Sequence, residues 1–343
     1  METQGGVATQ NSSNCSTGAP CTGHEFEEDI STGFNAQSDS FPIAIAIPII
    51  AVNCWVISLV CLKRSLRTVT NYILTSLALS DLCTGAISIP LFLSCNIIQE
   101  TKICVAADMF MRFTSTSTVL HILAMTTDRY ICIVYALRYM SWVTKKRVLY
   151  FIAVIWAISL FVMLVQLEWY DMNEGVMEEF SPENKKKIII VDSICFFAFV
   201  GLPVVVMAYT YGRILYEVHR QSRNIQRHNT PGWQETKRST RQEWKVASVF
   251  MVMLLVFVVC WGPFFLLRLE LVLGSNFFEV TFSPFAQILM LWLRFVSSLI
   301  NPCLYILGKP DFRKASGLSR KKRNRFNDSE TTRLTQSKGS TFV

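Results

Sequence analysis

The residues of this chain that could do chemistry are polar and charged side chains set within apolar runs. Such a side chain must be paired, bound to an ion or in contact with a water-filled cavity, so it is a functional candidate by default. We find no nucleophile beside a general base and no cluster of His, Asp and Glu with metal-ligand spacing, so we do not expect an enzyme. The candidates are Asn53, Asp81, Asp108, Arg112, His121, Asp128, Arg129, Asp192, Arg268, Glu270, Arg294 and Asn301.

The elements that must position these side chains are apolar segments of the length of membrane helices. The chain has 343 residues, of which 51% are hydrophobic and 17% are charged, whereas soluble domains carry about 25% charged residues. A hydrocarbon core of about 30 Å needs about 20 apolar residues in a helix. The sequence therefore predicts an all-α membrane protein, a seven-transmembrane helix bundle with spans at residues 41–62, 72–94, 104–134, 148–167, 188–215, 246–273 and 284–307.

The distribution of Lys and Arg predicts how the chain is oriented. The net charge of +8 comes from residues between and after the apolar segments, which indicates membrane topology rather than nucleic-acid binding. Because short cytoplasmic loops are rich in basic residues, we expect an extracellular amino terminus and a cytoplasmic carboxyl terminus in the plasma membrane. Glycosylation sequons at Asn11 and Asn14 fall on the predicted outer segment. The basic loop residues are Lys63, Arg64, Arg67, Arg138, Lys145, Lys146 and Arg147.

The chain divides by composition into four regions. Residues 1–40 predict a disordered, glycosylated extracellular segment, and residues 41–308 contain the seven spans. Residues 309–318 predict a short amphipathic helix on the membrane surface, and residues 319–343 predict a disordered cytoplasmic tail. Basic residues of the tail suit anionic membrane lipid, and its last residues, Thr341-Phe342-Val343, have the form of a ligand for PDZ domains.

Several motifs, in chain order, resemble those of the rhodopsin-like (class A) G-protein-coupled receptors. The aromatic residues of the upper half are similar to those of the amine-receptor branch. The resemblance implies a receptor that transmits an extracellular small-molecule signal to heterotrimeric G proteins by outward movement of the sixth helix, with receptor kinases and arrestin as further partners. The motif residues are Asn53, Asp81, Asp128-Arg129-Tyr130, Trp156, Pro203, Tyr211, Cys260-Trp261-Gly262-Pro263, Asn301-Pro302 and Tyr305.

The resemblance implies an activation switch at the cytoplasmic ends of the helices. Arg129 would pair with Asp128 and with Glu243 at the foot of the sixth helix, and the pair with Glu243 would be lost when that helix moves. Alternatively, Glu243 is solvated near Lys245 and does not reach Arg129. Arg129 and Leu137 are the implied contacts to the G protein. The switch residues are Asp128, Arg129, Tyr130, Tyr211, Glu243, Trp261, Pro263, Asn301, Pro302 and Tyr305.

The resemblance also implies a sodium site around Asp81, and no other cofactor is expected. Its residues are oxygen donors, which suit a hard cation. Ser297 stands where many relatives have asparagine. The alternative is a protonated Asp81 in a network of water. The residues of this site are Asn53, Asp81, Thr118, Ser297, Ser298 and Asn301.

The implied ligand pocket departs from that of amine receptors. Met111 replaces the third-helix aspartate that anchors an ammonium group, so the ligand is left open. Asp108 and Arg112 are spaced for a helical ion pair, although Asp108 could instead take over the ammonium. Arg294 predicts an internal ion pair with a carboxylate, or else an anion site. A built-in pair would favour a constitutively active, ligand-independent receptor. The pocket residues are Asp108, Met111, Arg112, Ser115, Cys195, Trp261, Phe264, Phe265, Arg268, Trp292, Arg294 and Phe295.

The outer disulfide departs from the family pattern as well. Cys104 matches the family's third-helix cysteine, but residues 166–187 contain no cysteine to pair with it. Cys95, Cys15 and Cys21 remain as candidates, and sequence does not fix the connectivity. A membrane transporter is the alternative from another functional class. It would be expected to show internal repeats, and we find none.

Overall fold

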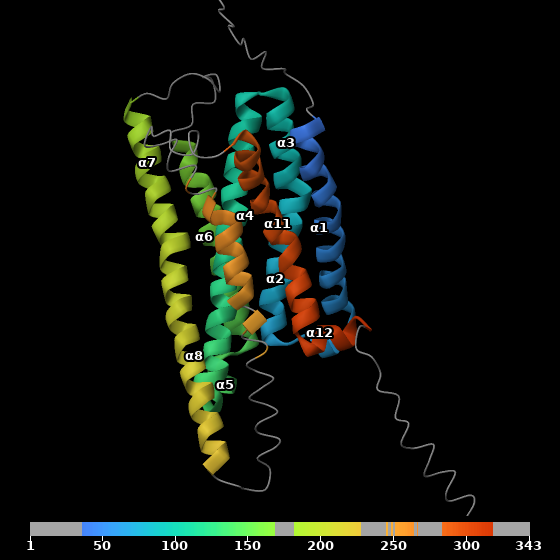
Figure 1. Cartoon of the computed structure of the whole chain (residues 1–343), viewed down its shortest axis with the longest axis vertical. Coiled ribbons are helices and arrows are strands. Elements are labelled where there is room, and N and C mark those ends of the chain that lie inside the picture. Colours follow the sequence, from blue (N-terminus) through green and yellow to red (C-terminus); the bar gives the residue numbers. More distant parts are fainter. Residues whose placement is uncertain are drawn as a thin grey trace, which may run out of the picture. The chain divides into compact units, whose positions relative to one another are not determined.

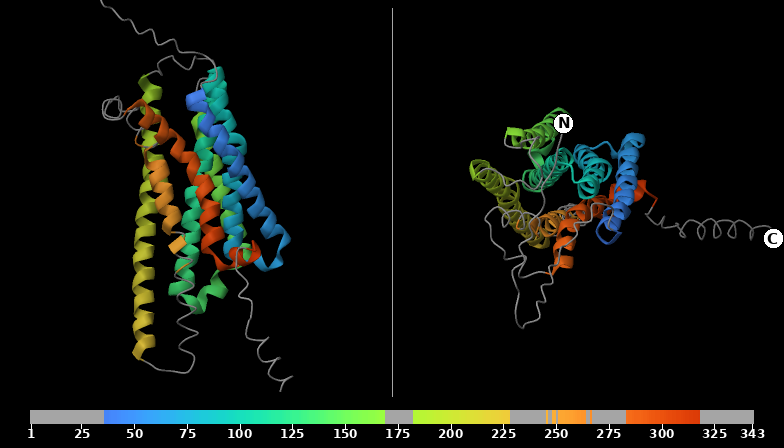
Figure 2. Two further views of the ribbon diagram at one scale, coloured as in Figure 1. Left: turned by 45° about the vertical axis from the view of Figure 1, so that its right-hand side comes forward. Right: turned by 90° about the horizontal axis from the view of Figure 1, so that it is seen from above.

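The computed structural model describes residues 36–168, 182–227, 245, 248–249, 251–263, 266 and 283–317. The chain separates into two compact units, Met1–Thr32 and Gly33–Val343, and all described residues belong to the second. The described residues form helices and contain no strand. The long helices of this unit lie side by side, as Figures 1 and 2 show.

The helices follow the predicted spans in order. Two spans are interrupted by a single π-helical turn, and two short helices, α5 (Ala136–Trp142) and α12 (Pro310–Ala315), follow the third and seventh spans. Residues of the sixth span are described chiefly in the helical stretch Met251–Pro263. The other elements are α1 (Ala36–Leu62), the 3-10 turn η1 (Arg64–Leu66), α2 (Val69–Cys83), η2 (Thr84–Ser88), α3 (Ile89–Ile98), α4 (Thr101–Val134), α6 (Lys145–Leu164), η3 (Val165–Glu168), α7 (Pro182–Phe196), η4 (Phe197–Gly201), α8 (Leu202–Arg227) and α11 (Pro284–Gly308).

Three helices have a capped first turn, and two of them, α2 and α6, begin three residues earlier than the apolar pattern predicts. The side chains of Thr68, Thr144 and Ser283 each accept a hydrogen bond from a backbone N–H three residues later. This satisfies one of the free N–H groups at a helix start. The α5 helix was not predicted at all, since it has seven residues and none of them is buried.

Four helical stretches of the described chain are long and apolar enough to cross a membrane: Asp39–Leu62, Val69–Ile98, Lys145–Glu168 and Ile288–Gly308. The α4 helix has 34 residues but carries polar side chains along its length. It contacts α2, α3, α6 and α8, so its buried polar residues face protein rather than lipid. Among its buried polar side chains are Thr114, Ser115, Thr116, Ser117, Thr118, His121, Asp128 and Arg129.

The two π-helical turns each come just before a proline. In η2 the N–H of Ile89 bonds to the carbonyl of Thr84, and in η4 the N–H of Leu202 bonds to the carbonyl of Phe197. These bonds span five residues instead of four. Because a proline lacks an N–H and crowds the preceding turn, the helix around it adjusts locally. Pro90 and Pro203 each lie two residues after the last residue of a turn.

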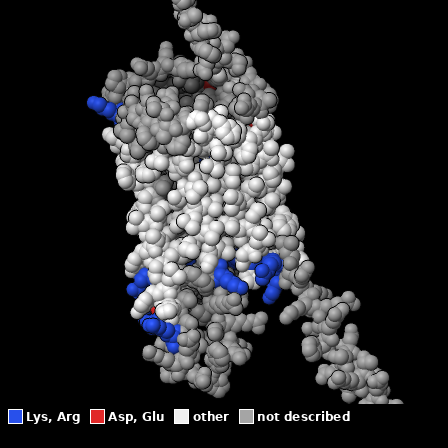
Figure 3. Space-filling view, viewed as in Figure 1, with Lys and Arg blue, Asp and Glu red and all other residues white. Residues whose placement is uncertain are grey.

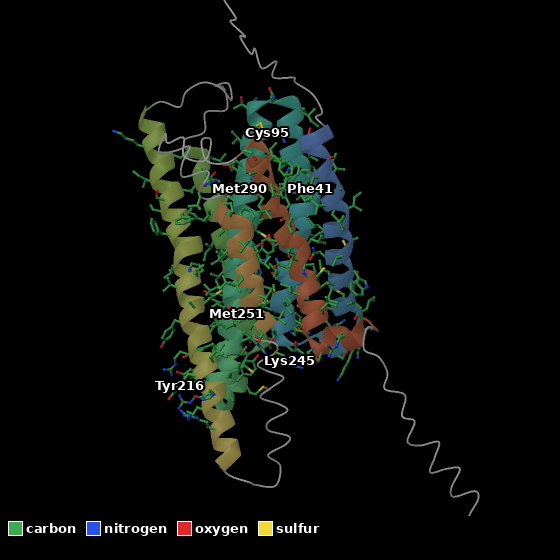
Figure 4. All side chains as sticks on the ribbon, in the orientation of Figure 1. Phe41, Cys95, Tyr216, Lys245, Met251 and Met290 are labelled. Atoms are coloured by element: carbon green, nitrogen blue, oxygen red, sulfur yellow. A yellow bond between two sulfur atoms is a disulfide. The ribbon has the colours of Figure 1, made fainter. Side chains whose placement is uncertain are left out.

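The charged residues separate the two ends of the bundle. Most Lys and Arg of the visible face form a belt at the end that holds α5 and α12, a smaller basic group lies at the opposite end, and the middle of the molecule carries none (Figure 3). We call the end that holds α5 and α12 the basic end. Cys95 lies at the opposite end from Lys245 (Figure 4).

Cys95 of α3 forms the disulfide with Cys104 of α4, with 4.7 Å between the two Cα atoms. Of the candidate partners of Cys104, the structure has Cys95 bonded to it, and Cys15 and Cys21 lie outside the described residues. The closed loop is short, with a sequence separation of nine residues. It includes the junction Gln99–Glu100, where Gln99 has a positive φ of 56°.

We expect the double substitution Cys95→Ser and Cys104→Ser to lower the free energy of unfolding by about 2–3 kcal/mol, the loop-entropy value for so short a loop. Thermal unfolding of the purified protein in detergent measures this. Cys54→Ser, at an exposed free cysteine of α1, is the matched control. An unchanged melting temperature in the double variant would contradict the prediction.

Candidate functional site

The basic end of the bundle contains a buried ion pair between neighbouring residues of α4. Arg129 donates hydrogen bonds from Nε and Nη2 to Asp128 Oδ2 at 3.1 and 2.6 Å. The Thr70 hydroxyl of α2 donates to the same carboxylate oxygen at 2.8 Å and accepts from Arg129 Nη2 at 2.6 Å. The guanidinium is therefore held against α2.

Tyr139 of α5 binds the other oxygen of the same carboxylate. Its hydroxyl donates to Asp128 Oδ1 at 2.8 Å. Burial, followed by the charge of Asp128, raises the pKa of Tyr139 well above its ordinary value. The phenol therefore stays protonated and donates, which fixes α5 to the end of α4.

The other predicted switch residues are spread along the bundle. The Tyr211 hydroxyl of α8 is 3.4 Å from Thr126 Oγ1 of α4. Tyr305 is fully buried near the end of α11, with its ring 5.5 Å from that of Phe312 in α12. Pro302 lies inside α11. Tyr130 is partly buried on α4, and Pro263 ends the described stretch of the sixth span.

Asp81 is the centre of a second buried polar cluster, halfway along the bundle. Asn301 Nδ2 of α11 donates to its two carboxylate oxygens at 3.2 and 3.5 Å, and the Ser298 side chain also bonds to it. Asn53 Nδ2 of α1 donates to the Ser298 carbonyl at 3.2 Å. Four of the six predicted sodium-site residues thus belong to one network. Thr118 is buried on α4 but has no hydrogen bond to these four in the described part of the chain.

Ser297 has different partners. Its hydroxyl donates to the Arg294 carbonyl at 2.8 Å and accepts from Trp261 Nε1 at 3.2 Å. Trp261 is 4% exposed, and its ring stacks at 6.0 Å on that of Phe257. Ser297 therefore joins the sixth-span tryptophan to α11.

The predicted ion pair in the upper half of α4 is present. Arg112 Nε donates to Asp108 Oδ2 at 3.0 Å, and both side chains are mostly buried. The Ser115 hydroxyl donates to the Arg112 carbonyl at 3.0 Å. The negative charge of Asp108 is therefore offset by Arg112, one turn further along the same helix.

Arg294 is 2% exposed and lies between aromatic rings. Its guanidinium carbon is 4.8 Å from the ring centroid of Phe92 in α3 and 4.9 Å from that of Phe295. A guanidinium over aromatic faces is attracted by their negative charge density. Phe295 and Met111 belong to the same apolar cluster between α1, α3, α4 and α11.

Trp292 lies further up α11, where its ring stacks at 4.7 Å on that of Phe41 in α1. Cys195 is partly buried in α7. The remaining predicted positions lie outside the described residues, so they stay predictions. They are Asn11, Asn14, Cys15, Cys21, Glu243, Phe264, Phe265, Arg268 and the tail residues that would meet kinases, arrestin, lipid and a PDZ domain.

One buried polar network was missed from the sequence. Ser76 of α2 accepts from Trp156 Nε1 of α6 at 2.9 Å, and its hydroxyl is 2.8 Å from His121 Nε2 of α4. His121 Nδ1 lies 2.7 Å from the Ser117 carbonyl. His121 looked like an isolated packed histidine in the sequence, since its partners come from two other spans. A polar residue on each of three neighbouring spans is the one signal that could have suggested them.

We expect Ser76→Ala to lower the free energy of unfolding by about 2–6 kcal/mol, because it leaves the Trp156 N–H and His121 Nε2 without partners and each such buried group costs about 1–3 kcal/mol. Thermal unfolding in detergent tests this against Ser58→Ala, which removes an exposed serine of α1. Equal melting temperatures for the two variants would refute it.

The junction of α11 and α12 holds a second unpredicted contact. Lys309 is 4% exposed, and its Nζ donates to Asn71 Oδ1 of α2 at 2.5 Å. Lys63 Nζ, between α1 and η1, donates to the Ala315 carbonyl of α12. These bonds hold α12 beside the start of α2.

A bundle of long apolar helices, crossed by buried polar clusters that join different spans, is the architecture of a multi-pass membrane protein. The chain belongs to the 7 transmembrane receptor (rhodopsin family), whose family profile matches residues 52–305. This confirms the predicted class, the seven-helix fold and the expectation that the protein is not an enzyme.

Curated relatives agree with the amine-receptor-like assignment. The chain is 29% identical to the histamine H2 receptor of Canis lupus familiaris, over 83% of this chain and 82% of the relative. It is 28% identical to the octopamine receptor beta-2R of Chilo suppressalis, over 80% and 77%. It is 27% identical to the adenosine receptor A3 of Ovis aries, over 77% and 83%.

Proposed function

We propose that this receptor binds a small extracellular molecule and activates heterotrimeric G proteins through outward movement of its sixth helix. The observation that carries the proposal is the cluster of Arg129, Asp128, Thr70 and Tyr139 at the basic end. A guanidinium buried at this end is available to a partner only after its contacts are rearranged. The proposal places the protein in the plasma membrane, with the basic end in the cytoplasm.

Leu137 supports a docking surface at the same end. This leucine of α5 is fully exposed, and Tyr139, two residues further on, binds Asp128 directly. We therefore expect Leu137 to contact the G protein while Tyr139 links that contact to Arg129. An exposed apolar side chain beside a buried ion pair suits a partner that inserts between helices.

The residues around Asp81 fit a sodium ion. Asp81 and Ser298 supply carboxylate and hydroxyl oxygens, and Asn53 Oδ1 and Ser80 Oγ are buried oxygens without a hydrogen-bond partner among the described residues. Oxygen ligands are those a hard cation prefers. Bound sodium would supply a positive charge beside Asp81 and so hold α2 and α11 together. Ser297 is a weaker candidate because Trp261 and the Arg294 carbonyl engage its hydroxyl.

The ligand should differ from an ordinary amine. The relatives are named for histamine, octopamine and adenosine, but Met111 stands at the ammonium-anchoring position and Arg112 offsets the charge of Asp108. We propose a small-molecule pocket in the upper half of the bundle that recognises its ligand through other groups, with Trp292 and Arg294 on its α11 side.

A second candidate is a receptor that signals without a ligand. The observation in its favour is Arg294, which is buried among Phe92 and Phe295, so the chain's own cation occupies a place where a ligand's charged group could bind. A permanent occupant that stabilises the active arrangement would shift the resting population toward it.

The deciding experiment measures cyclic AMP in both directions and calcium in cells that express rising amounts of the receptor without added ligand. Arg294→Ala is compared with the unmodified protein at equal surface expression. Output that rises with expression and falls in the variant supports the second candidate. Output that is flat in both supports a ligand-dependent receptor, and amines and small anions are then screened against variants of Asp108, Arg112 and Arg294.

A further inference from the structure

A groove with a cavity volume of about 310 Å³ opens on the surface between α4, α5 and α6. This lies at the lower limit of small-molecule pockets, which run from about 300 to 1,000 Å³. Its walls are apolar side chains of α4 and α6, with Trp142 of α5 at one end. Five of its lining residues, Thr127, Trp142, Arg147, Phe151 and Ile158, are exposed, so the groove faces outward, where a membrane protein meets lipid.

The length of the groove matches one leaflet of a bilayer. On α6 it extends from Arg147 to Ile158, and on α4 from Leu120 to Ile131. At about 1.5 Å per residue, each wall is about 16 Å long. Half of a hydrocarbon core of about 30 Å is about 15 Å. An acyl chain that starts at the basic end would therefore lie along the whole groove.

The charges at the groove's mouth are complementary to an anionic headgroup. Arg147 lines the groove and is exposed, and Lys145 and Lys146 precede it. Its Nη1 donates to the carbonyls of Ser141 and Trp142, while Nε and Nη2 make no hydrogen bond to the described residues. A guanidinium offers five N–H donors and suits phosphate. Figure 3 shows the wider belt of Lys and Arg at this level.

The one acidic residue of the lining does not oppose an anion there. Asp128 borders the groove, but its carboxylate oxygens accept hydrogen bonds from Arg129, Thr70 and Tyr139. The ion pair with Arg129 offsets its charge.

We propose that this groove binds one anionic phospholipid of the cytoplasmic leaflet, with an acyl chain between α4 and α6 and the phosphate on Arg147. The leaflet follows from the orientation proposed above. Trp142 and Val143, at the end of α5, line the same groove. The bound lipid therefore packs α5 against α4 and stabilises the position of Tyr139 on Asp128.

The test is native mass spectrometry of the purified full-length receptor after incubation with equal amounts of phosphatidylserine and phosphatidylcholine. We expect one retained phosphatidylserine in preference to phosphatidylcholine. In Arg147→Gln the ratio of the two adducts should fall about fivefold, as the loss of one basic group near a phospholipid headgroup predicts. Arg64→Gln, at an exposed arginine of η1 outside the groove, should leave the ratio unchanged.

A second pair of variants tests the apolar part without altering charge. Thr127→Phe places a ring in the groove from an exposed position and should remove the retained phosphatidylserine. Leu160→Phe adds a ring at an exposed position of α6 outside the lining and should not. The proposal is overturned if the unmodified receptor shows no preference between the lipids, if Arg64→Gln reduces the ratio as much as Arg147→Gln, or if Thr127→Phe retains the lipid.

Discussion

The substitution Asp128→Asn is expected to raise ligand-independent second-messenger output about tenfold at equal surface expression. Asp128 Oδ2 accepts two hydrogen bonds from Arg129 and one from Thr70. An amide keeps the size of the side chain but removes the charge. Breaking a buried ion pair costs about 3–5 kcal/mol, and about 1.4 kcal/mol is enough for a tenfold shift in a two-state ratio. The rise is limited by the maximum output of the assay.

Tyr139→Phe is the graded control for this prediction. It removes one hydrogen bond to Asp128 Oδ1 and leaves the ion pair intact. Its effect on basal output should therefore be in the same direction but smaller. A hydrogen bond to a charged group contributes about 1.5–3 kcal/mol, whereas breaking the buried ion pair costs about 3–5 kcal/mol. If Asp128→Asn gives the same basal output as the unmodified receptor, this cluster does not restrain the active state.

The second large effect is expected at the basic end of the seventh span. Gly308 ends α11, and a Cβ built on it would overlap the Val249 side chain of the sixth span. The two spans approach this closely because residue 308 has no side chain. In Gly308→Ala the new methyl group pushes the sixth span away from α11. This destabilises the arrangement in which the two spans are in contact by about 1–3 kcal/mol. We expect basal second-messenger output to rise about fivefold or more, since 1.4 kcal/mol shifts a ratio tenfold.

The matched test is the double variant Gly308→Ala with Val249→Ala. Removing the Val249 methyl groups makes room for the new Cβ, so the double variant should return toward the unmodified output. The difference between the single and double variants measures the coupling of the two positions. Equal output from the single and double variants would show that contact with Val249 is not the cause.

The sequence predicted the helices and their polar residues well, because both are local properties. Each apolar run contains a helix among the described residues, and the spacing of Asp108 and Arg112 predicted the ion pair within one helix. The boundaries were shifted where a polar first turn is capped, as at Thr144. The length of an apolar run does not predict a polar first turn, because that turn lies outside the run.

Contacts between helices were mostly not predictable. Ser76 and His121, or Lys309 and Asn71, meet only because two helices have particular rotations about their axes, and one sequence does not report a rotation. The surroundings of Arg294 are a similar case, since Phe92 comes from the second span. Tyr139 was missed for a further reason. The α5 helix has no buried residue, so no apolar run in the sequence predicts it.

The π-helical turn at Thr84–Ser88 sets which side chains α3 turns toward the rest of the bundle. In a π-helical turn the backbone N–H bonds to the carbonyl five residues earlier instead of four. The turn therefore inserts one extra residue into the second span. Beyond that point every position of α3 is rotated by about 100° relative to a span without the insertion, since a helix has 3.6 residues per turn. Without the extra residue, Phe92 and Cys95 would be turned by the same angle away from Arg294 and Cys104, which they contact now.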